Sequence, residues 1–246
     1  MSGARPLALV TGGMRRLGAA IARRLADAGY DLALSSHVDG RPEIEFGADI
    51  NWHCFVADLT DPAAPVKLIA AVVTHFGRAP DLLVNNAAMF GQDDWEAMDA
   101  GVLKEHFRLN TFAPILLAQA LVKSALRQVA IVHITDQRIK NPHIDQFSYT
   151  LSKQALAASV QTMATAFGTK ARVNAVAPGL VIATEDYAKG QSERLASLMP
   201  LGALPDAEAV AQAVLYLATA SHVTGQTLFV DGGAHLKSFD RDFVYL

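Results

Sequence analysis

Short apolar, β-branched runs recur along the chain and alternate with longer segments whose apolar positions have helical spacing. The strand-like runs lie at residues 7–11, 31–35, 52–57, 81–86, 129–135, 172–177 and 226–230. The helical patterns lie at residues 17–28, 62–76, 98–124, 147–168 and 206–219, with a short helix expected at 191–198. Because the strand-like runs are continuously apolar, we expect a parallel sheet buried on both faces. The alternation predicts an α/β fold, a single-domain doubly wound (Rossmann) parallel sheet of about seven strands with helices on both faces.

Length and composition fit one domain over residues 1–246. The chain is 51% hydrophobic and 18% charged, which suits a large core. A net charge of −3 with interspersed signs indicates neither a nucleic-acid partner nor a membrane partner, and we expect no signal peptide. A single cysteine excludes an internal disulfide and suits a reducing cytoplasm. The 8 histidines show no metal-ligand spacing, so we expect a cytoplasmic protein that binds a small-molecule substrate and no catalytic metal.

The first strand-like run leads into a glycine-rich turn, TGGMRRLGAA. Gly12 and Gly13 would allow close approach of a pyrophosphate, and Gly18 would let the following helix pack against the strand. The amide groups at the start of that helix would then face a phosphate. Ala19 and Ala20 replace the Lys and Ser/Thr of a nucleotide triphosphatase loop, which excludes that class. The G-x-G-x-x-G spacing is absent too, so the turn alone also fits a strand–turn–helix that binds nothing.

The end of the second predicted strand indicates which dinucleotide the turn would bind. A protein specific for NAD holds the ribose 2′-hydroxyl with an acid near this point. Here the strand ends at Ser36 and His37, with no acid at its tip. Arg15 in the turn, and Arg41 a few residues later, would instead suit the 2′-phosphate of NADP. We therefore predict NADP(H) as the cofactor.

Tyr149 and Lys153 lie four residues apart on the predicted helix 147–168, so their side chains share a face. A phenol has an ordinary pKa of about 10, which is high for catalysis at neutral pH. A neighbouring ammonium group lowers that pKa toward the range in which general acid–base catalysis is effective. The pair is therefore a candidate catalytic couple, although the spacing alone is common by chance.

Over nearly its whole length the chain resembles the short-chain dehydrogenase/reductase family. The matching segments, in family order, are TGGMRRLG, ADLTD (57–61), NNAA (85–88), FRLN, YTLSK (149–153), VNAVAPG (173–179) and VTGQTLFVDGG (223–233). The resemblance implies that Tyr149 donates or accepts a proton. It also implies that Lys153 holds the nicotinamide ribose and that Asn110 anchors a water in the proton relay. A homotetramer is a further implication.

The resemblance also assigns the cofactor contacts. Asp58 would contact the adenine amino group, and Asn86 would shape the cofactor floor. The backbone of Pro178 and Gly179 would meet the carboxamide end of the nicotinamide. Together with the turn and the tip of the second strand, the expected cofactor-binding set is Gly12, Arg15, Arg16, Leu17, Gly18, Ser36, His37, Asp58, Leu59, Asn86, Ala87, Pro178 and Gly179.

Two departures from the common family pattern narrow the expected substrate. Asp136 stands 13 residues before Tyr149, where the family usually has a serine. An ionised carboxylate only accepts hydrogen bonds, so Asp136 would suit ring N–H or amino groups, or deliver a proton if its pKa were raised. Thr135 is the alternative for the serine's role. The second departure is Arg16, which occupies the place of the turn's middle glycine.

Arg16 and Asp136 together resemble the pteridine reductase and dihydromonapterin reductase branch of the family. Phe90 fits an aromatic residue that this branch often has shortly after NNA. In that branch the flat pterin lies between the nicotinamide and the aromatic ring, and the arginine bridges cofactor phosphate and substrate. The resemblance therefore implies substrate binding by Arg16, Phe90, Asp136 and Tyr149, and catalysis by Tyr149, Lys153, Asp136 and Asn110.

Three other segments lead to expectations. Residues 180–200 should form a substrate lid, in which Glu185 and Asp186 would meet amino groups or face solvent. The link between the second and third strands is short, so the helix usual at that point should be short or missing. The apolar tail 243–246 would be exposed in a monomer, so we expect it to pack on a neighbouring subunit.

The sequence leaves three functions open. The first is an NADPH-dependent reductase of a dihydropterin C=N bond, with protonation assisted by Tyr149 and Asp136. The second is an NADP(H)-dependent carbonyl reductase or alcohol dehydrogenase of unknown substrate. The third is a non-catalytic nucleotide sensor. Because Tyr149, Lys153 and Asn110 are all present, we favour an enzyme over the sensor. The coincidence of Arg16, Phe90 and Asp136 favours the first function over the second.

Overall fold

A single parallel sheet forms the centre of the molecule. The computed structural model describes residues 5–40, 42–96, 98–181, 187–188 and 190–246. The strands are β1 (Leu7–Thr11), β2 (Asp31–Ser36), β3 (Trp52–Val56), β4 (Leu82–Asn85), β5 (Val129–Ile134), β6 (Ala171–Pro178) and β7 (Thr227–Val230). They pair in the order β3-β2-β1-β4-β5-β6-β7, and every pair is parallel. This confirms the predicted doubly wound α/β fold and all of its expected strands.

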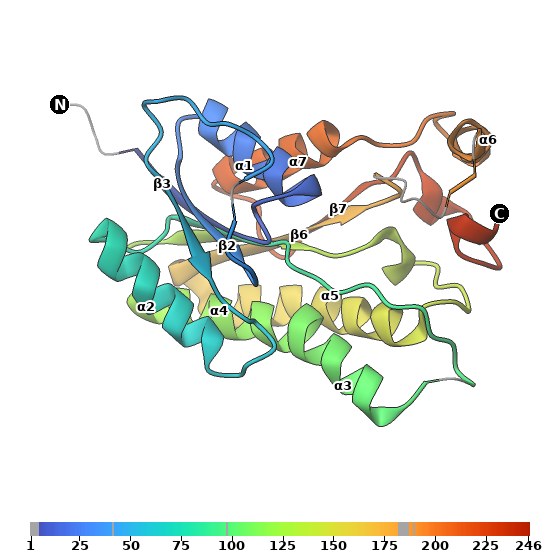
Figure 1. Cartoon of the computed structure of the whole chain (residues 1–246), viewed down its shortest axis with the longest axis horizontal. Helices are drawn as coiled ribbons and strands as arrows, with labels where there is room; N and C mark the ends of the chain where they lie inside the picture. Colours follow the sequence, from blue (N-terminus) through green and yellow to red (C-terminus); the bar gives the residue numbers. More distant parts are fainter. Residues whose placement is uncertain (1–4, 41, 97, 182–186, 189) are drawn as a thin grey trace.

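Helices cover both faces of this sheet (Figure 1). On one face lie α1 (Arg16–Asp27) and α7 (Ala207–Thr219), and on the other lie α2 (Ala64–Phe76), α4 (Ala113–Ser124) and α5 (Phe147–Phe167). The remaining helices are α3 (Ala100–Phe107), below the sheet in Figure 1, and the short α6 (Gln191–Leu198).

The side chains of β1 show how both faces of the sheet are buried. Leu7 and Leu9 belong to the core beneath α2, α4 and α5, whereas Ala8 and Val10 belong to the core beneath α1 and α7. All four are fully buried. Successive residues of a strand point to opposite faces, so a strand between two helical layers must be apolar throughout.

The structure divides one predicted helix. The pattern at residues 98–124 is continuous, but the chain forms α3, then a π-helical turn at Arg108–Phe112, then α4. A π-helical turn holds an extra residue, and such turns are frequent at functional sites. Within the described residues 37–40 and 42–51 there is no helix, as expected for the short link between β2 and β3. In the part of the chain that the structure describes, no helix is long and apolar enough to cross a membrane.

The C-terminal tail packs partly on its own chain, so the expectation that a monomer would expose it is wrong for Phe243, whereas Tyr245 is 52% exposed. Phe243 is 4% exposed and lies in a small core with Leu195 of α6 and Met199. The side-chain amide of Gln191 donates to the carbonyl oxygens of Phe243, Val244 and Leu246, at 2.9, 3.1 and 3.0 Å. The burial of Phe243 could not be predicted from the sequence, because the apolar surface of α6 that receives it is formed only in the folded chain. Figure 1 shows α6 and the C-terminus side by side.

Candidate active site

The glycine turn after β1 brings three segments into close contact. Gly12 has a φ of +62°, which favours glycine, and a Cβ on Gly18 would overlap the carbonyl oxygen of Gly12. The side chain of Asn86, at the end of β4, donates to the carbonyl oxygens of Thr11 and Gly12 at 2.9 and 3.2 Å. The hydroxyl of Thr11 accepts from the backbone amides of Asn86 and Ala87, at 3.0 Å each. Thr11 was not among the predicted site residues.

A cavity of about 680 Å³ opens beside this turn, at the carboxyl ends of the first strands. Most of the predicted cofactor-binding residues line it: Gly12, Arg15, Arg16, Leu17, Gly18, Ser36, His37, Asp58, Leu59, Asn86 and Ala87. Pro178 and Gly179 do not line this cavity; Pro178 ends β6 and Gly179 follows it, where a Cβ on Gly179 would lie 2.8 Å from Cα of Asp231. Seven further residues that were not predicted complete the wall of the cavity: Met14, Ser35, Ala57, Thr60, Ala88, Met89 and Leu109.

Both arginines of the turn have exposed side chains at this cavity. Arg16 has a φ of +50°, a left-handed conformation unusual for a residue other than glycine. Its backbone amide donates to the carboxylate of Glu43 at 2.7 Å. Among the described residues neither guanidinium belongs to an ion pair, so both are available to an anion in the cavity. Arg41, the third predicted cation, lies outside the described residues.

Asp58 sits at the far wall of the cavity, after β3. Its carboxylate accepts from the backbone amide of Thr60 at 2.9 Å and from the Thr60 hydroxyl at 2.7 Å. These hydrogen bonds lower the pKa of Asp58 below its usual value, so it is an ionised acceptor at neutral pH.

Tyr149 lies in the first turn of α5, and its hydroxyl donates to Oδ2 of Asp136 at 2.9 Å. Burial and the negative charge of Asp136 raise the pKa of Tyr149 well above its ordinary value. The expectation that Lys153 lowers this pKa is therefore not met in this state of the protein, because the two larger effects act the other way. The phenol is fully protonated at neutral pH and is held as a hydrogen-bond donor.

Lys153 follows one helical turn later and is 3% exposed. Its ammonium donates to the carbonyl oxygen of Ile134 at 2.8 Å and lies 5.8 Å from the centre of the Tyr149 ring. Burial lowers the pKa of Lys153 to about 8, although Asp136 opposes the shift. The two side chains share a face of α5, as predicted, but no hydrogen bond joins them.

Asn110 is fully buried in the π-helical turn. Its side chain exchanges hydrogen bonds with the backbone of Met89, at 2.9 and 3.0 Å, and donates to the Ser152 hydroxyl at 3.0 Å. Asn110 thus ties the loop after β4 to α5. Its predicted role in holding a water stays a prediction.

Phe90 lies beside the catalytic couple. Its ring packs edge-to-face on Tyr149, with centroids 4.8 Å apart, and is 54% exposed. The buried guanidinium of Arg138 lies 5.5 Å from the Phe90 centroid and 5.2 Å from that of Tyr149. The structure therefore brings Phe90, Asp136 and Tyr149 together, with a solvent-accessible aromatic ring next to a hydrogen-bonding pair.

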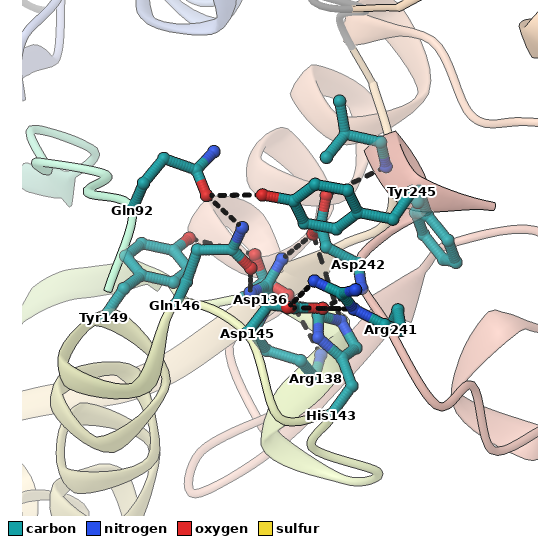
Figure 2. Close-up of polar contacts among 12 residues, drawn as sticks. Gln92, Asp136, Arg138, His143, Asp145, Gln146, Tyr149, Arg241, Asp242 and Tyr245 are labelled. Atoms are coloured by element: carbon teal, nitrogen blue, oxygen red, sulfur yellow. Dashed lines mark hydrogen bonds and ion pairs between the residues drawn. The ribbon is translucent and has the colours of Figure 1, made fainter. Parts of the chain in front are cut away.

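Behind the Asp136–Tyr149 pair lie further polar residues that were not predicted, shown in Figure 2. Arg138 donates to Asp136, Gln146 and Asp242, and Gln146 in turn donates to Gln92 at 2.9 Å. Their places in the sequence gave no signal except for Arg138, which stands two residues after Asp136. Of the predicted lid, α6 is described, whereas Glu185 and Asp186 lie outside the described residues. No group of three or more metal-ligating side chains occurs in the described part of the chain.

Comparison with known proteins places the chain in a family. A family model described as enoyl-(acyl carrier protein) reductase matches residues 12–235. The (3R)-3-hydroxyacyl-CoA dehydrogenase of Mus musculus is 31% identical over 251 residues, covering 92% of this chain and 95% of the relative. Pteridine reductase 1 of Leishmania tarentolae is 29% identical over 280 residues, covering 94% and 96%.

A solved structure gives a similar result. FolM alternative dihydrofolate reductase 1 of Brucella canis, complexed with NADP, has a TM-score of 0.84 and 33% sequence identity, and the match covers 95% of this chain and 96% of that one. The family match, the shared sheet and the Tyr149–Lys153 couple at its edge lead to one conclusion: this chain belongs to the short-chain dehydrogenase/reductase family.

Proposed function

We propose that this protein is an NADPH-dependent reductase of a C=N bond in a dihydropterin. The observation that carries the proposal is the Asp136–Tyr149 hydrogen bond of 2.9 Å beneath the exposed ring of Phe90. A flat, nitrogen-rich ring stacked on Phe90 would meet an aromatic face and a carboxylate acceptor together. The likeness to a pteridine reductase and to a FolM alternative dihydrofolate reductase supports the same substrate class.

NADP(H) fits the cavity beside the first turn. The wall combines closely packed glycines, the start of α1 and the exposed cations Arg15 and Arg16, which suit a pyrophosphate and an additional phosphate. The relative from Brucella canis was solved with NADP. When bound, NADPH supplies the hydride that the substrate carbon receives.

The chain's own residues supply the proton and the orientation. The nitrogen of the reduced C=N bond takes a proton, and we assign the protonated Tyr149 hydroxyl as its donor. Lys153, with its pKa near 8, carries positive charge at neutral pH and stabilises the phenolate that remains. Asp136 accepts hydrogen bonds from N–H groups of the substrate and so fixes the ring that is reduced.

A carbonyl substrate is the second candidate, favoured by the likeness to a (3R)-3-hydroxyacyl-CoA dehydrogenase. Following NADPH oxidation by absorbance with dihydropterins, dihydrofolate and a panel of ketones separates the two. The pterin proposal expects turnover of a dihydropterin and a loss of about 100-fold in Asp136→Ser, because a hydroxyl replaces a charged acceptor. Turnover of ketones alone, unchanged or improved in Asp136→Ser, would establish the second candidate. Binding of NADPH without turnover of any compound would identify a nucleotide sensor.

We also propose that the protein is a cytoplasmic homotetramer. The chain mass of 26.2 kDa makes the assembly easy to test by sedimentation equilibrium. A particle of about four chain masses supports the tetramer, whereas a monomer or dimer contradicts it.

A further inference from the structure

A buried arginine stands directly behind the Asp136–Tyr149 pair. Arg138 is 5% exposed, and its backbone amide and Nε donate to Oδ1 of Asp136 at 2.9 and 3.2 Å. The other oxygen of that carboxylate, Oδ2, accepts from Tyr149. Because the backbone amide and Nε of Arg138 both bind Oδ1, they fix the rotation of the carboxylate about the Cβ–Cγ bond of Asp136. Arg138 therefore determines which oxygen faces the tyrosine and the substrate.

The same guanidinium is held from the opposite side by the C-terminal tail (Figure 2). An NH group of Arg138 donates to Oδ2 of Asp242 at 2.7 Å, and both side chains are 6% exposed. Although burial lowers the pKa of Arg138, the nearby negative charges of Asp136 and Asp242 outweigh it and raise that pKa overall. One buried cation thus links two carboxylates that are 106 residues apart in the sequence.

The position of Asp242 is itself fixed by several contacts. Its backbone amide donates to Asp145 at 2.7 Å, and its Oδ1 accepts from the amide of Val244 at 3.0 Å. Asp145 also pairs with Arg241 at 2.8 Å. The tail around Asp242 is therefore an ordered turn, held by these hydrogen bonds.

A strained residue completes the arrangement around the guanidinium. Gln146 is fully buried with a φ of +49°, a conformation that costs energy in a residue with a side chain. Its side-chain oxygen Oε1 accepts from Arg138 at 2.9 Å, and its side-chain Nε2 donates to Oε1 of Gln92, which also accepts from the Tyr245 hydroxyl at 3.3 Å. Strain of this kind persists where the surroundings demand it, and it is frequent at active sites.

We propose that Arg138 is a positioning residue for the reaction and that Asp242 acts through it, which makes the C-terminal tail a working part of this chain's own active site. Asp242 holds the guanidinium, the guanidinium orients the Asp136 carboxylate, and that carboxylate orients the Tyr149 hydroxyl. The proposal rests on the reductase activity proposed above, but not on the identity of the substrate.

A double-mutant cycle tests whether Arg138 acts through Asp136. We expect Arg138→Met to lower kcat about 10- to 100-fold while the Kd for NADPH changes less than about two-fold. In the background of Asp136→Asn the same change should lower kcat by no more than about two-fold, because the group it orients has already been altered. Losses that multiply would show that Arg138 supports the fold generally and would overturn the proposal.

The tail is tested by Asp242→Asn, a mild change that leaves an acceptor for the Val244 amide. We expect kcat to fall about 3- to 10-fold, with Asp240→Asn, at an exposed carboxylate of the same tail, as the matched control that leaves kcat within about two-fold of the wild type. Equal effects of the two variants, or no effect of Asp242→Asn, would contradict a specific role for Asp242.

A substrate-independent measurement separates this inference from the proposed substrate. Hydrogen–deuterium exchange of residues 242–246 should be faster in both Arg138→Met and Asp242→Asn than in the wild type, and unchanged in Asp240→Asn. Unchanged exchange in the first two variants would overturn the link between tail and site. If wild-type enzyme reduces ketones but no dihydropterin, the proposed function fails, and the cycle is measured with the ketone to decide the role of Arg138.

Discussion

At the scale of single residues, the environment of Tyr149 is the main result. The spacing to Lys153 predicted a shared helix face, and α5 confirms it. The pKa of Tyr149 is nevertheless raised, because the sequence could not show that burial and Asp136 together outweigh an ammonium that is turned toward the Ile134 carbonyl. The phenol is therefore protonated at neutral pH and donates a hydrogen bond to Asp136.

The first prediction concerns this donor. Tyr149→Phe removes only the hydroxyl, so we expect kcat to fall about 100- to 10,000-fold while the Kd for NADPH stays nearly unchanged. Kinetics and fluorescence titration of NADPH measure the two quantities. Tyr216→Phe, at an exposed position of α7, is the matched control and should behave as wild type. Activity within ten-fold of the wild type would show that another group delivers the proton.

A second prediction at this scale concerns acid stability. Burial, with a smaller effect of the Lys153 charge, lowers the pKa of His133 in β5 to about 3, while its pKa in the unfolded chain is about 6.5. Between these values the unfolded chain binds more protons, so the free energy of unfolding falls as the pH falls. The slope contributed by this group approaches about 1.4 kcal/mol per pH unit.

His133→Asn keeps an acceptor for the Asn85 amide, which lies 3.1 Å from Nδ1 of the ring, but removes the titration. Urea unfolding between pH 7 and pH 4 should therefore show a shallower loss of stability than in the wild type. His222→Asn, at an exposed site, should leave the pH dependence unchanged. Parallel curves for His133→Asn and the wild type would refute the assignment.

At the scale of elements, prediction from the sequence works where local pattern determines structure. Every strand was found within one or two residues. For the central strands the reason is that a strand buried on both faces must be apolar throughout, whereas the edge strand β3 is partly exposed. The π-helical turn at Arg108–Phe112 could not be found, since one extra residue per turn leaves the apolar pattern unbroken. The cofactor cavity was largely predictable, because its walls follow directly after strands in the sequence.

The turn between β1 and α1 gives the third prediction. A methyl group on Gly18 would overlap the Gly12 carbonyl and come within 2.7 Å of the Asn86 amide, so Gly18→Ala must push α1 away from the turn. We expect the Kd for NADPH to rise at least about ten-fold, because the amides that face the phosphates move. Gly40→Ala, with nothing within 4 Å of its Cβ, is the control. Calorimetric titration measures the Kd for NADPH of the wild type and of both variants. An unchanged Kd in Gly18→Ala would show that the turn does not bind the cofactor.

At the scale of the whole molecule, contacts between distant parts of the chain complete the site. Arg138 and Asp242 are 104 residues apart, and Gln92 and Tyr245 are 153 apart. No local pattern records such pairings, so the sequence placed the tail on a neighbouring subunit and could not show that Arg138 meets Asp242. Within one chain α6 and the tail pack on each other, so the assembly is not needed to cover Phe243.

The last prediction concerns the stability of the molecule with its cofactor. A ligand that binds only the folded state at 100 times its Kd adds about 2.7 kcal/mol to the free energy of unfolding. For a chain of this length that raises the Tm by roughly 5 to 10 °C. Because Arg15 is exposed at the cavity with no acid at the tip of β2, NADPH should produce a larger shift than NADH at equal concentration. Arg15→Ala should reduce the shift with NADPH and leave the shift with NADH unchanged.

Thermal melts of the wild type, Arg15→Ala and Arg23→Ala measure these differences. Arg23 is exposed on α1 but does not line the cavity beside the turn. The Arg23→Ala variant should therefore keep the wild-type preference for NADPH over NADH. If NADH stabilises the wild type as much as NADPH does, the preference for NADP is wrong, and the exposed cations serve the pyrophosphate or the substrate instead. If Arg15→Ala loses the larger Tm shift with NADPH and Arg23→Ala keeps it, Arg15 binds the 2′-phosphate. That result would agree with the absence of an acid at Ser36 and His37, the tip of β2.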